Sequence, residues 1–436
     1  MKKTLNRWVY LIVGAIAMFF VGLIYAWSVI SGFMVGNNGW TDSQLVWVST
    51  IVLCCFCFGS LLGGIYQKKI SVKILIAISA IIFLLGFVIT ATASSILMVY
   101  VGFGLFAGFA GGLAYNVFMG TVSKWFPDKQ GMASGVLLMS FGIGSFIVGK
   151  VYTAVVSNGS ISWQKGIIAL GIISAVVMLI GAALFAVPSA EDTAKYMQGA
   201  GKANSIPYED IPTKVMLKRP AFWLAFIWAT LIVGGGVAII FLGRPIAVAA
   251  VPALADAPGT VATAVGIISV CNAVSRILSG SLYSKLGYKV IFVASGVFFI
   301  AAMFILMLAF STGSIVLLFI SYICIGLGYG IVPPTQSAFT NKFFGSTYYP
   351  VNFSIVVMNL IISSFASKLA DAVYTSANSY TPVLIGIIVI SALAIVAALL
   401  IKTPKTTVAE RTDAAEAAEN EKDSDIKASE TVSSNA

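Results

Sequence analysis

Long apolar segments divide this sequence, and they restrict its possible folds more than any other feature. Most of them hold roughly 20 or more residues, the length of a helix that crosses a bilayer core of about 30 Å, whereas a barrel strand needs only about ten. Charged residues make up 10% of the chain, far below the quarter or so that is typical of soluble domains. We therefore predict an all-α integral membrane protein with twelve transmembrane helices. The predicted helices cover residues 8–33, 43–66, 73–93, 95–121, 131–156, 165–187, 220–244, 259–284, 289–310, 313–339, 350–374 and 381–401.

Lysine and arginine residues are concentrated on one side of these predicted helices. If the amino terminus is cytoplasmic, the outer connections hold only Lys165 and Arg244, and the other basic residues between helices lie inside. This bias predicts that both termini are cytoplasmic and that the protein resides in the cell (cytoplasmic) membrane. The net charge of +10 follows from the same bias and indicates contact with the lipid bilayer, not with nucleic acid.

A polar segment that contains Pro207 and Pro212 separates the sixth predicted helix from the seventh. The chain is thus divided into an N-terminal six-helix bundle at 1–187, a cytoplasmic linker at 188–219, a C-terminal six-helix bundle at 220–401 and a cytoplasmic tail at 402–436. The tail is rich in Ala, Glu, Ser and Thr without apolar periodicity, so we expect it to be disordered.

The two predicted bundles resemble each other. A shift of 217 positions places Gly63 and Lys68, where the second helix leads into the third, on Gly280 and Lys285, where the eighth leads into the ninth. A parallel repeat of two six-helix bundles is the architecture of many secondary carriers, in which the substrate lies near the midplane between the halves. These pseudo-symmetric bundles therefore predict a carrier.

A single strong cation, Arg276, interrupts the apolar eighth helix. An arginine inside a membrane helix costs about 2.5–3.5 kcal/mol even on lenient insertion scales, and such residues usually line a water-filled path. Helical spacing places Ser269, Asn272 and Ser279 on the same face as Arg276, and Val270, Val274 and Leu278 on the other. We therefore predict that Arg276 contacts the substrate. The alternative is that its side chain snorkels to the cytoplasmic interface, because Lys285 lies only nine residues further on.

Several stretches resemble known carriers. The segment 280–289 resembles the G-x-x-x-D-R-x-G-R-R signature of the major facilitator superfamily, with Ser284 at the acidic position. Other stretches resemble the oxalate/formate antiporter family of that superfamily, which is similar to the monocarboxylate transporters. These stretches are 22–28 (GLIYAWS), 124–131 (KWFPDKQG), 220–223 (PAFW), 343–345 (FFG) and 351–354 (VNFS).

The resemblance implies specific binding residues. Arg276 occupies the place of the eighth-helix arginine that pairs with the substrate carboxylate, a role that suits a planar guanidinium with a permanent charge. Asn272, one turn earlier, could hold the guanidinium or a substrate hydroxyl. Tyr115, Tyr329 and Tyr25 are candidates to line the cavity, with ordinary helix packing as the alternative for each.

The sequence also departs from these families at two places. Oxalate carriers are expected to have a lysine in the eleventh helix, where this chain has Asn359 and Leu360, and Asn272 stands where animal-type monocarboxylate transporters are expected to have an aspartate. We therefore expect alternating-access transport of a small monocarboxylate such as lactate or pyruvate, by proton symport or anion exchange, with Asn359 near a substrate hydroxyl or keto oxygen. The alternatives are an oxalate/formate-type antiporter and a transporter-like carboxylate sensor.

Other functional classes find no support in the residues. The chain has no histidine, and its five cysteines all fall within predicted helices, so neither a metal site nor a disulfide framework is indicated. There is no phosphate-binding P-loop and no paired carboxylate at mid-membrane, so we expect no cofactor and no enzyme activity. We expect the carrier to act as a monomer. Three charged residues near the outer helix ends, Lys150, Lys368 and Asp371, are expected to snorkel or to form a lid salt bridge.

Overall fold

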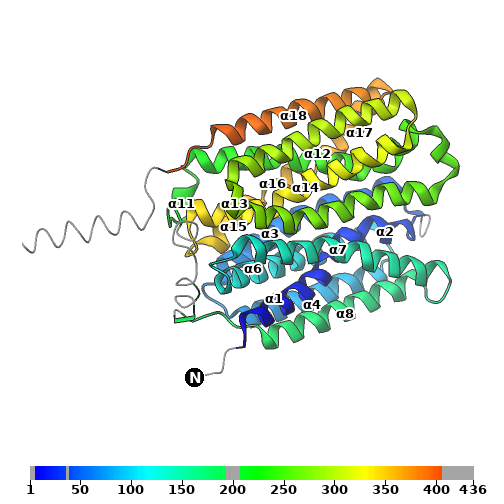
Figure 1. Cartoon of the computed structure of the whole chain (residues 1–436). Coiled ribbons are helices and arrows are strands. Elements are labelled where there is room, and N and C mark those ends of the chain that lie inside the picture. Colours follow the sequence, from blue (N-terminus) through cyan, green and yellow to red (C-terminus); the bar gives the residue numbers. More distant parts are fainter. Residues whose placement is uncertain (1–4, 36–38, 190, 193–195, 197–206, 405–436) are drawn as a thin grey trace, which may run out of the picture.

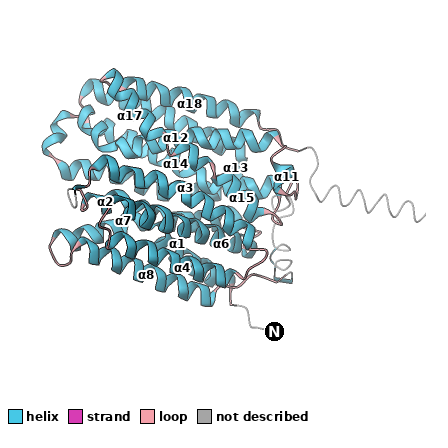
Figure 2. Cartoon of the chain, turned by 180° about the vertical axis from the view of Figure 1, so that it is seen from behind, coloured by secondary structure: helices cyan, strands magenta, loops and turns pink. Residues whose placement is uncertain are grey.

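The computed structural model describes residues 5–35, 39–189, 191–192, 196 and 207–404, and the regular elements within them are all helices. The helices form two bundles that lie side by side with their axes roughly parallel (Figure 1; Figure 2 from behind). The start of α1 (Arg7–Val21) and the end of α18 (Thr381–Leu400) lie at the same end of the molecule, which we call the terminal end. The predicted tail lies outside the described residues from position 405 onward.

The first bundle contains two spans that are interrupted. The first span passes through a 3-10 segment, and the fourth passes through a π-helical segment, a distortion that often accompanies functional sites. The elements of this bundle are α1, η1 (Gly22–Ala26), α2 (Trp27–Gly32), α3 (Asp42–Tyr66), α4 (Val72–Ala91), α5 (Ile96–Val99), η3 (Tyr100–Ala107), α6 (Gly108–Trp125), α7 (Gln130–Ser157) and α8 (Trp163–Leu184).

The second bundle has longer helices, and its eleventh span is broken into three. Its elements are α11 (Thr213–Met216), α12 (Pro220–Ala250), η4 (Pro252–Asp256), α13 (Pro258–Thr312), α14 (Ile315–Phe344), α15 (Tyr349–Val357), α16 (Asn359–Ser363), α17 (Ala366–Ala377) and α18.

The described chain contains 11 helical segments long and apolar enough to cross a membrane, and α13 accounts for the difference from the twelve predicted. This helix has 55 residues, which would extend about 80 Å if straight, more than twice the bilayer core. At Gly287 the backbone leaves the helical region, with φ 77° and ψ 166°, a conformation that glycine adopts readily. The next residue, Tyr288, donates its hydroxyl to the carbonyl of Ile401 at 2.9 Å, so this turn lies at the terminal end. The predicted eighth and ninth helices are the two parts of α13 on either side of Gly287.

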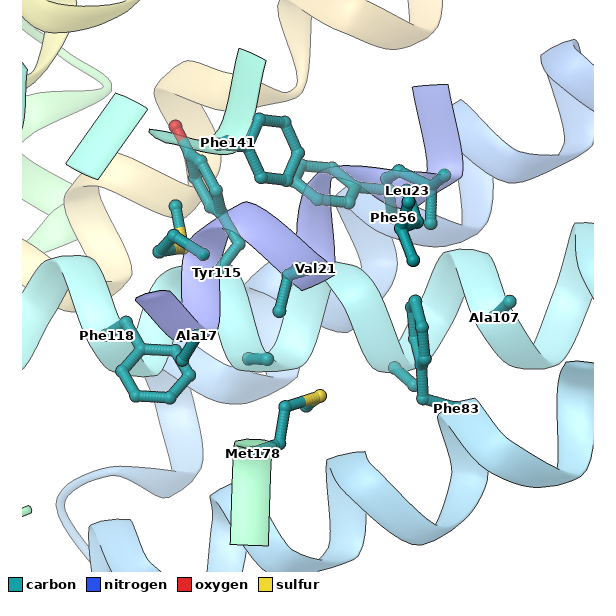
Figure 3. Close-up of a cluster of buried hydrophobic side chains, with 14 of the residues drawn as sticks. Ala17, Val21, Leu23, Phe56, Phe83, Ala107, Tyr115, Phe118, Phe141 and Met178 are labelled. Atoms are coloured by element: carbon teal, nitrogen blue, oxygen red, sulfur yellow. The ribbon is translucent and has the colours of Figure 1, made fainter. Parts of the chain in front are cut away.

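Each bundle has its own hydrophobic core. The first core extends from Tyr10 to Phe185 and also includes Tyr349, Phe353 and Val357 of α15, and the second extends from Met216 to Ile401. Figure 3 shows part of the first core, where Phe83, Phe118 and Met178 pack between helices. The burial of large apolar side chains explains why each bundle behaves as a packing unit.

The two bundles meet closely at the terminal end. Gly131 of α7 faces Gly280 of α13, and Gly64 of α3 faces Pro350 of α15, so close in each pair that a Cβ on the glycine would overlap the opposing carbonyl oxygen. Small residues permit this approach because they let helix backbones touch. Near the same end, the side-chain amide of Asn341 donates to Oε1 of Gln130 across the boundary. The terminal end is therefore closed in this conformation.

The loop between α6 and α7, which carries the tryptophan-phenylalanine-proline stretch, ties together three helices. The indole Nε1 of Trp125 donates to the carbonyl of Ala186 at 2.7 Å, just after α8. Asp128 receives two hydrogen bonds from the Arg7 guanidinium at 2.6 and 3.1 Å, at the start of α1. These bonds give the stretch a structural role within the first bundle.

The described part of the predicted linker, from Pro207 onward, packs against the second bundle. The amide of Tyr208 donates to the carbonyl of Lys342 at 2.8 Å, and the Arg219 guanidinium pairs with Glu209 at 2.6 Å. Most of the linker before Pro207 lies outside the described residues.

Candidate functional site

A small cavity lies between the two bundles, with Arg276 in its wall. It leaves about 40 Å³ for the centres of water-sized molecules, whereas one bound water needs about 10–15 Å³ on that scale. The cavity therefore has room for only a few non-hydrogen atoms in this conformation. Its lining residues are Tyr25, Phe56, Tyr115, Leu138 and Phe141 from the first bundle and Val233, Arg276, Tyr329, Pro333, Gln336, Val357 and Leu360 from the second.

Arg276 is only 6% exposed and points into the bundle. Its Nε donates to Oδ1 of Asn272 at 3.1 Å, one turn earlier on α13. Its Nη1 donates to the backbone carbonyl of Leu138 on α7, in the other bundle. The opposite face of this helix, with Val270 and Val274, is exposed on the outer surface of the bundle. The side chain thus does not run along the helix surface, as snorkelling to the interface would require.

Two glycines of α7 make room for Arg276. A Cβ on Gly142 would lie 2.9 Å from Nη1, and a Cβ on Gly135 would lie 2.8 Å from the Arg276 carbonyl oxygen. Together with Leu138 they occupy positions i, i+3 and i+7 of the helix, which share one face. The fit of the guanidinium between the bundles therefore depends on a glycine face of α7, which the sequence analysis did not single out.

The structure brings the three predicted tyrosines to this cavity from three elements. Tyr25 lies on η1, Tyr115 on α6 and Tyr329 on α14. The rings of Tyr25 and Tyr115 each lie 5.4 Å from that of Phe141, both edge-on. Figure 3 shows Tyr115 beside Phe141, with its hydroxyl directed away from the packed core around Phe118. The walls are thus aromatic, with phenol hydroxyls as polar groups.

Asn359, which the sequence predicted near a substrate oxygen, is buried and is not among the residues that line this cavity. Its Nδ2 donates to the carbonyl of Val356 at 2.6 Å, and its Oδ1 has no hydrogen-bond partner among the described residues. The next residue, Leu360, lines the cavity instead. The structure therefore presents an apolar side chain, not an amide, from this part of the eleventh span.

Gln336 is a polar lining residue that the sequence analysis missed. It is 7% exposed, and its Nε2 is buried without a hydrogen-bond partner in the part of the chain that the structure describes. Tyr329, Pro333 and Gln336 stand at i, i+4 and i+7 of α14 and so share one face. This spacing was the signal in the sequence that could have identified Gln336.

The charged residues near the far end of the bundles lie outside this cavity. Lys150 lies 5.4 Å from the ring of Phe146, and Lys368 lies 5.9 Å from the ring of Trp47. Neither lysine nor Asp371 forms a salt bridge among the described residues. The residues that the structure describes contain no group of three or more His, Cys, Asp or Glu side chains able to hold a metal ion.

Curated proteins with similar sequences are transporters by name. The chain is 24% identical over 360 residues to "Uncharacterized MFS-type transporter YhjX" of Escherichia coli, covering 82% of this chain and 86% of that protein. It is 24% identical over 385 residues to the "Oxalate:formate antiporter" of Oxalobacter formigenes, covering 87% and 88%. A shorter match, 26% identical over 129 residues, relates 30% of this chain to 26% of "Monocarboxylate transporter 12" of Mus musculus.

A comparison of folds and a comparison with protein families give consistent results. The solved structure of the proton:xylose symporter XylE, 14% identical, superposes with a TM-score of 0.72 and covers 93% of this chain and 98% of its own. At that identity the likeness concerns the fold alone. Residues 10–367 match the Major Facilitator Superfamily, which accounts for the apolar spans and the paired bundles. This chain is therefore a multi-pass integral membrane protein that belongs to the major facilitator superfamily of transporters.

Proposed function

We propose that this protein is a secondary active transporter of a small monocarboxylate such as lactate or pyruvate. The observation that carries the proposal is the charge of the central cavity. Among the described residues that line it, Arg276 is the only ionised one, and it is almost fully buried. A lone buried cation in the cavity calls for an anion of one negative charge, because an unpaired buried charge is strongly unfavourable.

The geometry of Arg276 suits a carboxylate. A guanidinium carries five N–H groups in a planar fork, and the bonds to Asn272 and Leu138 use two of them. A carboxylate can accept parallel hydrogen bonds from such a fork, and these charge-assisted bonds are stronger than neutral ones. Asn272 then acts as the residue that orients the guanidinium.

The proposal extends to the movement and orientation of the protein. The bundles at 1–187 and 220–401 would rock about the cavity, opening it to one side of the membrane at a time. The bias of basic residues places the terminal end, and both chain termini, in the cytoplasm. The conformation described here is then the one closed toward the cytoplasm, because Gly131 and Gly280 meet at that end.

The second candidate is oxalate/formate exchange, which the name of the Oxalobacter formigenes relative suggests. Oxalate carries two negative charges, and Arg276 can neutralise only one. At the position where a lysine is expected in oxalate carriers, the cavity is lined by Leu360. Leaving one charge of a dianion without a partner should lower its binding by about 2–3 kcal/mol even with partial hydration, or roughly a hundredfold in affinity.

Competition in proteoliposomes distinguishes the two candidates. Unlabelled lactate and oxalate are titrated against labelled lactate in wild type, in Leu360→Lys and in the neutral control Leu360→Met. We expect wild type and Leu360→Met to bind lactate more tightly, and we expect the added ammonium of Leu360→Lys to raise oxalate affinity. If wild type binds oxalate more tightly than lactate, the monocarboxylate proposal is wrong.

The same vesicles report the coupling of transport. Preloading with unlabelled lactate tests anion exchange, and an imposed proton gradient tests proton symport. If purified protein binds lactate but moves none under either condition, the transporter-like sensor becomes the better description.

A further inference from the structure

Gln336 is a buried hydrogen-bond donor without a partner among the residues that the structure describes. Its side chain is more than nine-tenths buried, it lines the Arg276 cavity, and its Nε2 has no partner among the described residues. Buried polar groups are almost always hydrogen-bonded, so an exception inside a binding cavity points to a ligand atom. The missing partner must be an acceptor, because an amide N–H can only donate.

We propose that the Gln336 amide donates a hydrogen bond to the oxygen on the second carbon of the substrate. Together with Arg276 it would select monocarboxylates with a 2-keto or 2-hydroxy group over simple short-chain acids. This inference rests on the proposed function, because it assumes that Arg276 holds the carboxylate. It adds a specificity-determining residue that the charge argument does not supply.

The size of the cavity supports simultaneous contact with both residues. Arg276 comes from α13 and Gln336 from α14, and both line the same space of about 40 Å³. An anion of about six non-hydrogen atoms, as in lactate or pyruvate, is larger than this space in the conformation described, so once bound it would contact both walls. In these acids the second-carbon oxygen is adjacent to the carboxylate, so the two donors can address neighbouring groups of one molecule.

Asn359 is a poor candidate for this contact. Its Nδ2 already donates to Val356, and only its Oδ1 lacks a described partner. A purely structural alternative is that a water molecule links the Gln336 amide to this oxygen. That alternative predicts a contribution of Gln336 to folding but none to the choice between substrates.

Substrate pairs that differ in one oxygen separate these explanations. Pyruvate, lactate and propionate have the same number of carbons and one carboxylate, but propionate lacks the second-carbon oxygen. Inhibition constants of all three are measured against labelled pyruvate in proteoliposomes containing wild type or Gln336→Met. The matched control is Gln130→Met, because Gln130 also has a buried Nε2 without a described partner but lines a different cleft at the terminal end.

We expect wild type to prefer pyruvate and lactate over propionate by about tenfold or more, since sites built to bind a substrate oxygen reject analogues that lack it. Gln336→Met should lose most of this preference while binding propionate within about threefold of wild type. Gln130→Met should keep the preference. An unchanged preference in Gln336→Met, or a wild type without any preference, would overturn the assignment of Gln336 alone.

Two further results keep the test decisive. If Gln336→Met does not reach the membrane, Gln336→Asn replaces it in the test, because it shortens the side chain by one methylene and withdraws the amide. We expect the same loss of preference, and an unchanged preference in Gln336→Asn also overturns the assignment. If wild type binds none of the three acids, the proposed function fails, and this inference fails with it.

Discussion

The most informative single change concerns Gly142, because it displaces Arg276 without removing it. A Cβ at Gly142 would lie 2.9 Å from Nη1 and 3.2 Å from Cζ of Arg276. Ordinary contacts between non-bonded atoms lie at about 3.5–4.0 Å, so Gly142→Ala should push the guanidinium away by roughly half an ångström or more. The tip of an arginine side chain can move by that distance, so we expect the variant to fold.

The displacement should weaken substrate binding. Nη1 already donates to the Leu138 carbonyl on the same face of α7, and moving it strains both this bond and the carboxylate fork. Loss of one hydrogen bond to a charged group costs about 1.5–3 kcal/mol, which corresponds to about a tenfold to hundredfold rise in Kd. Alanine favours the helix over glycine by up to about 1 kcal/mol, so reduced helix stability cannot explain a loss.

Binding and uptake of labelled lactate by purified Gly142→Ala measure this effect. The matched control is Gly149→Ala on the same helix, where a Cβ would meet its nearest neighbour, Cγ2 of Val29, at an ordinary 3.5 Å. We expect Gly149→Ala to bind like wild type. A Gly142→Ala protein whose Kd stays within about twofold of wild type, while Gly149→Ala also stays unchanged, would refute the assignment of Arg276 to the substrate.

Three further predictions follow from the described contacts. Arg276→Lys should insert normally but lose at least about tenfold in lactate affinity, because an ammonium cannot reproduce the planar fork; full uptake by this variant contradicts the proposed anchor. Asp371→Asn should retain proton-driven uptake, because Asp371 is exposed on α17 and lies outside the cavity. If this variant instead loses proton-driven uptake but keeps exchange, Asp371 is a proton carrier. Asp128→Asn should lower the free energy of unfolding by about 1–3 kcal/mol, because it removes the charge and one of the two acceptor oxygens of the mostly buried contact with Arg7. Thermal unfolding in detergent, with exposed Asp256→Asn as control, measures this.

The membrane spans were predictable because bilayer thickness dictates segment length. Breaks inside the spans were not. The first span changes to a 3-10 segment at Gly22, and the eleventh divides near Met358 and Phe365, although hydropathy is continuous across these positions. Such breaks depend on neighbouring helices, which can satisfy backbone groups that a straight helix would satisfy itself.

Arg276 was predictable as a cavity residue for an energetic reason, because an arginine inside a membrane helix is costly and usually faces the bundle interior or a water-filled cavity. The choice between Asn359 and Leu360 was not predictable in the same way. Adjacent helical residues differ by about 100° around the axis, so a phase error of one residue replaces an amide with an aliphatic chain at the cavity wall. Gln336 shares a helix face with the predicted Tyr329, and this spacing was a usable signal. Pro333 and Pro334 lie between the two residues, and prolines can bend a helix, so the spacing alone was a weaker guide here than in a regular helix.

Arg276 joins the substrate cavity to the contact between the bundles. Its Nη1 donates to Leu138 across the boundary, whereas its Nε donates to Asn272 within its own bundle. If the bundles rock, the bond across the boundary is the one that must lengthen, and a buried guanidinium that loses a partner is destabilised. Loss of a proton offers no relief, because a guanidinium keeps its charge, and no carboxylate occurs among the described lining residues. A bound carboxylate supplies the missing partner, so we expect the loaded carrier to reorient more readily than the empty one, and the substrate anion itself to act as the counter-ion that makes the movement possible.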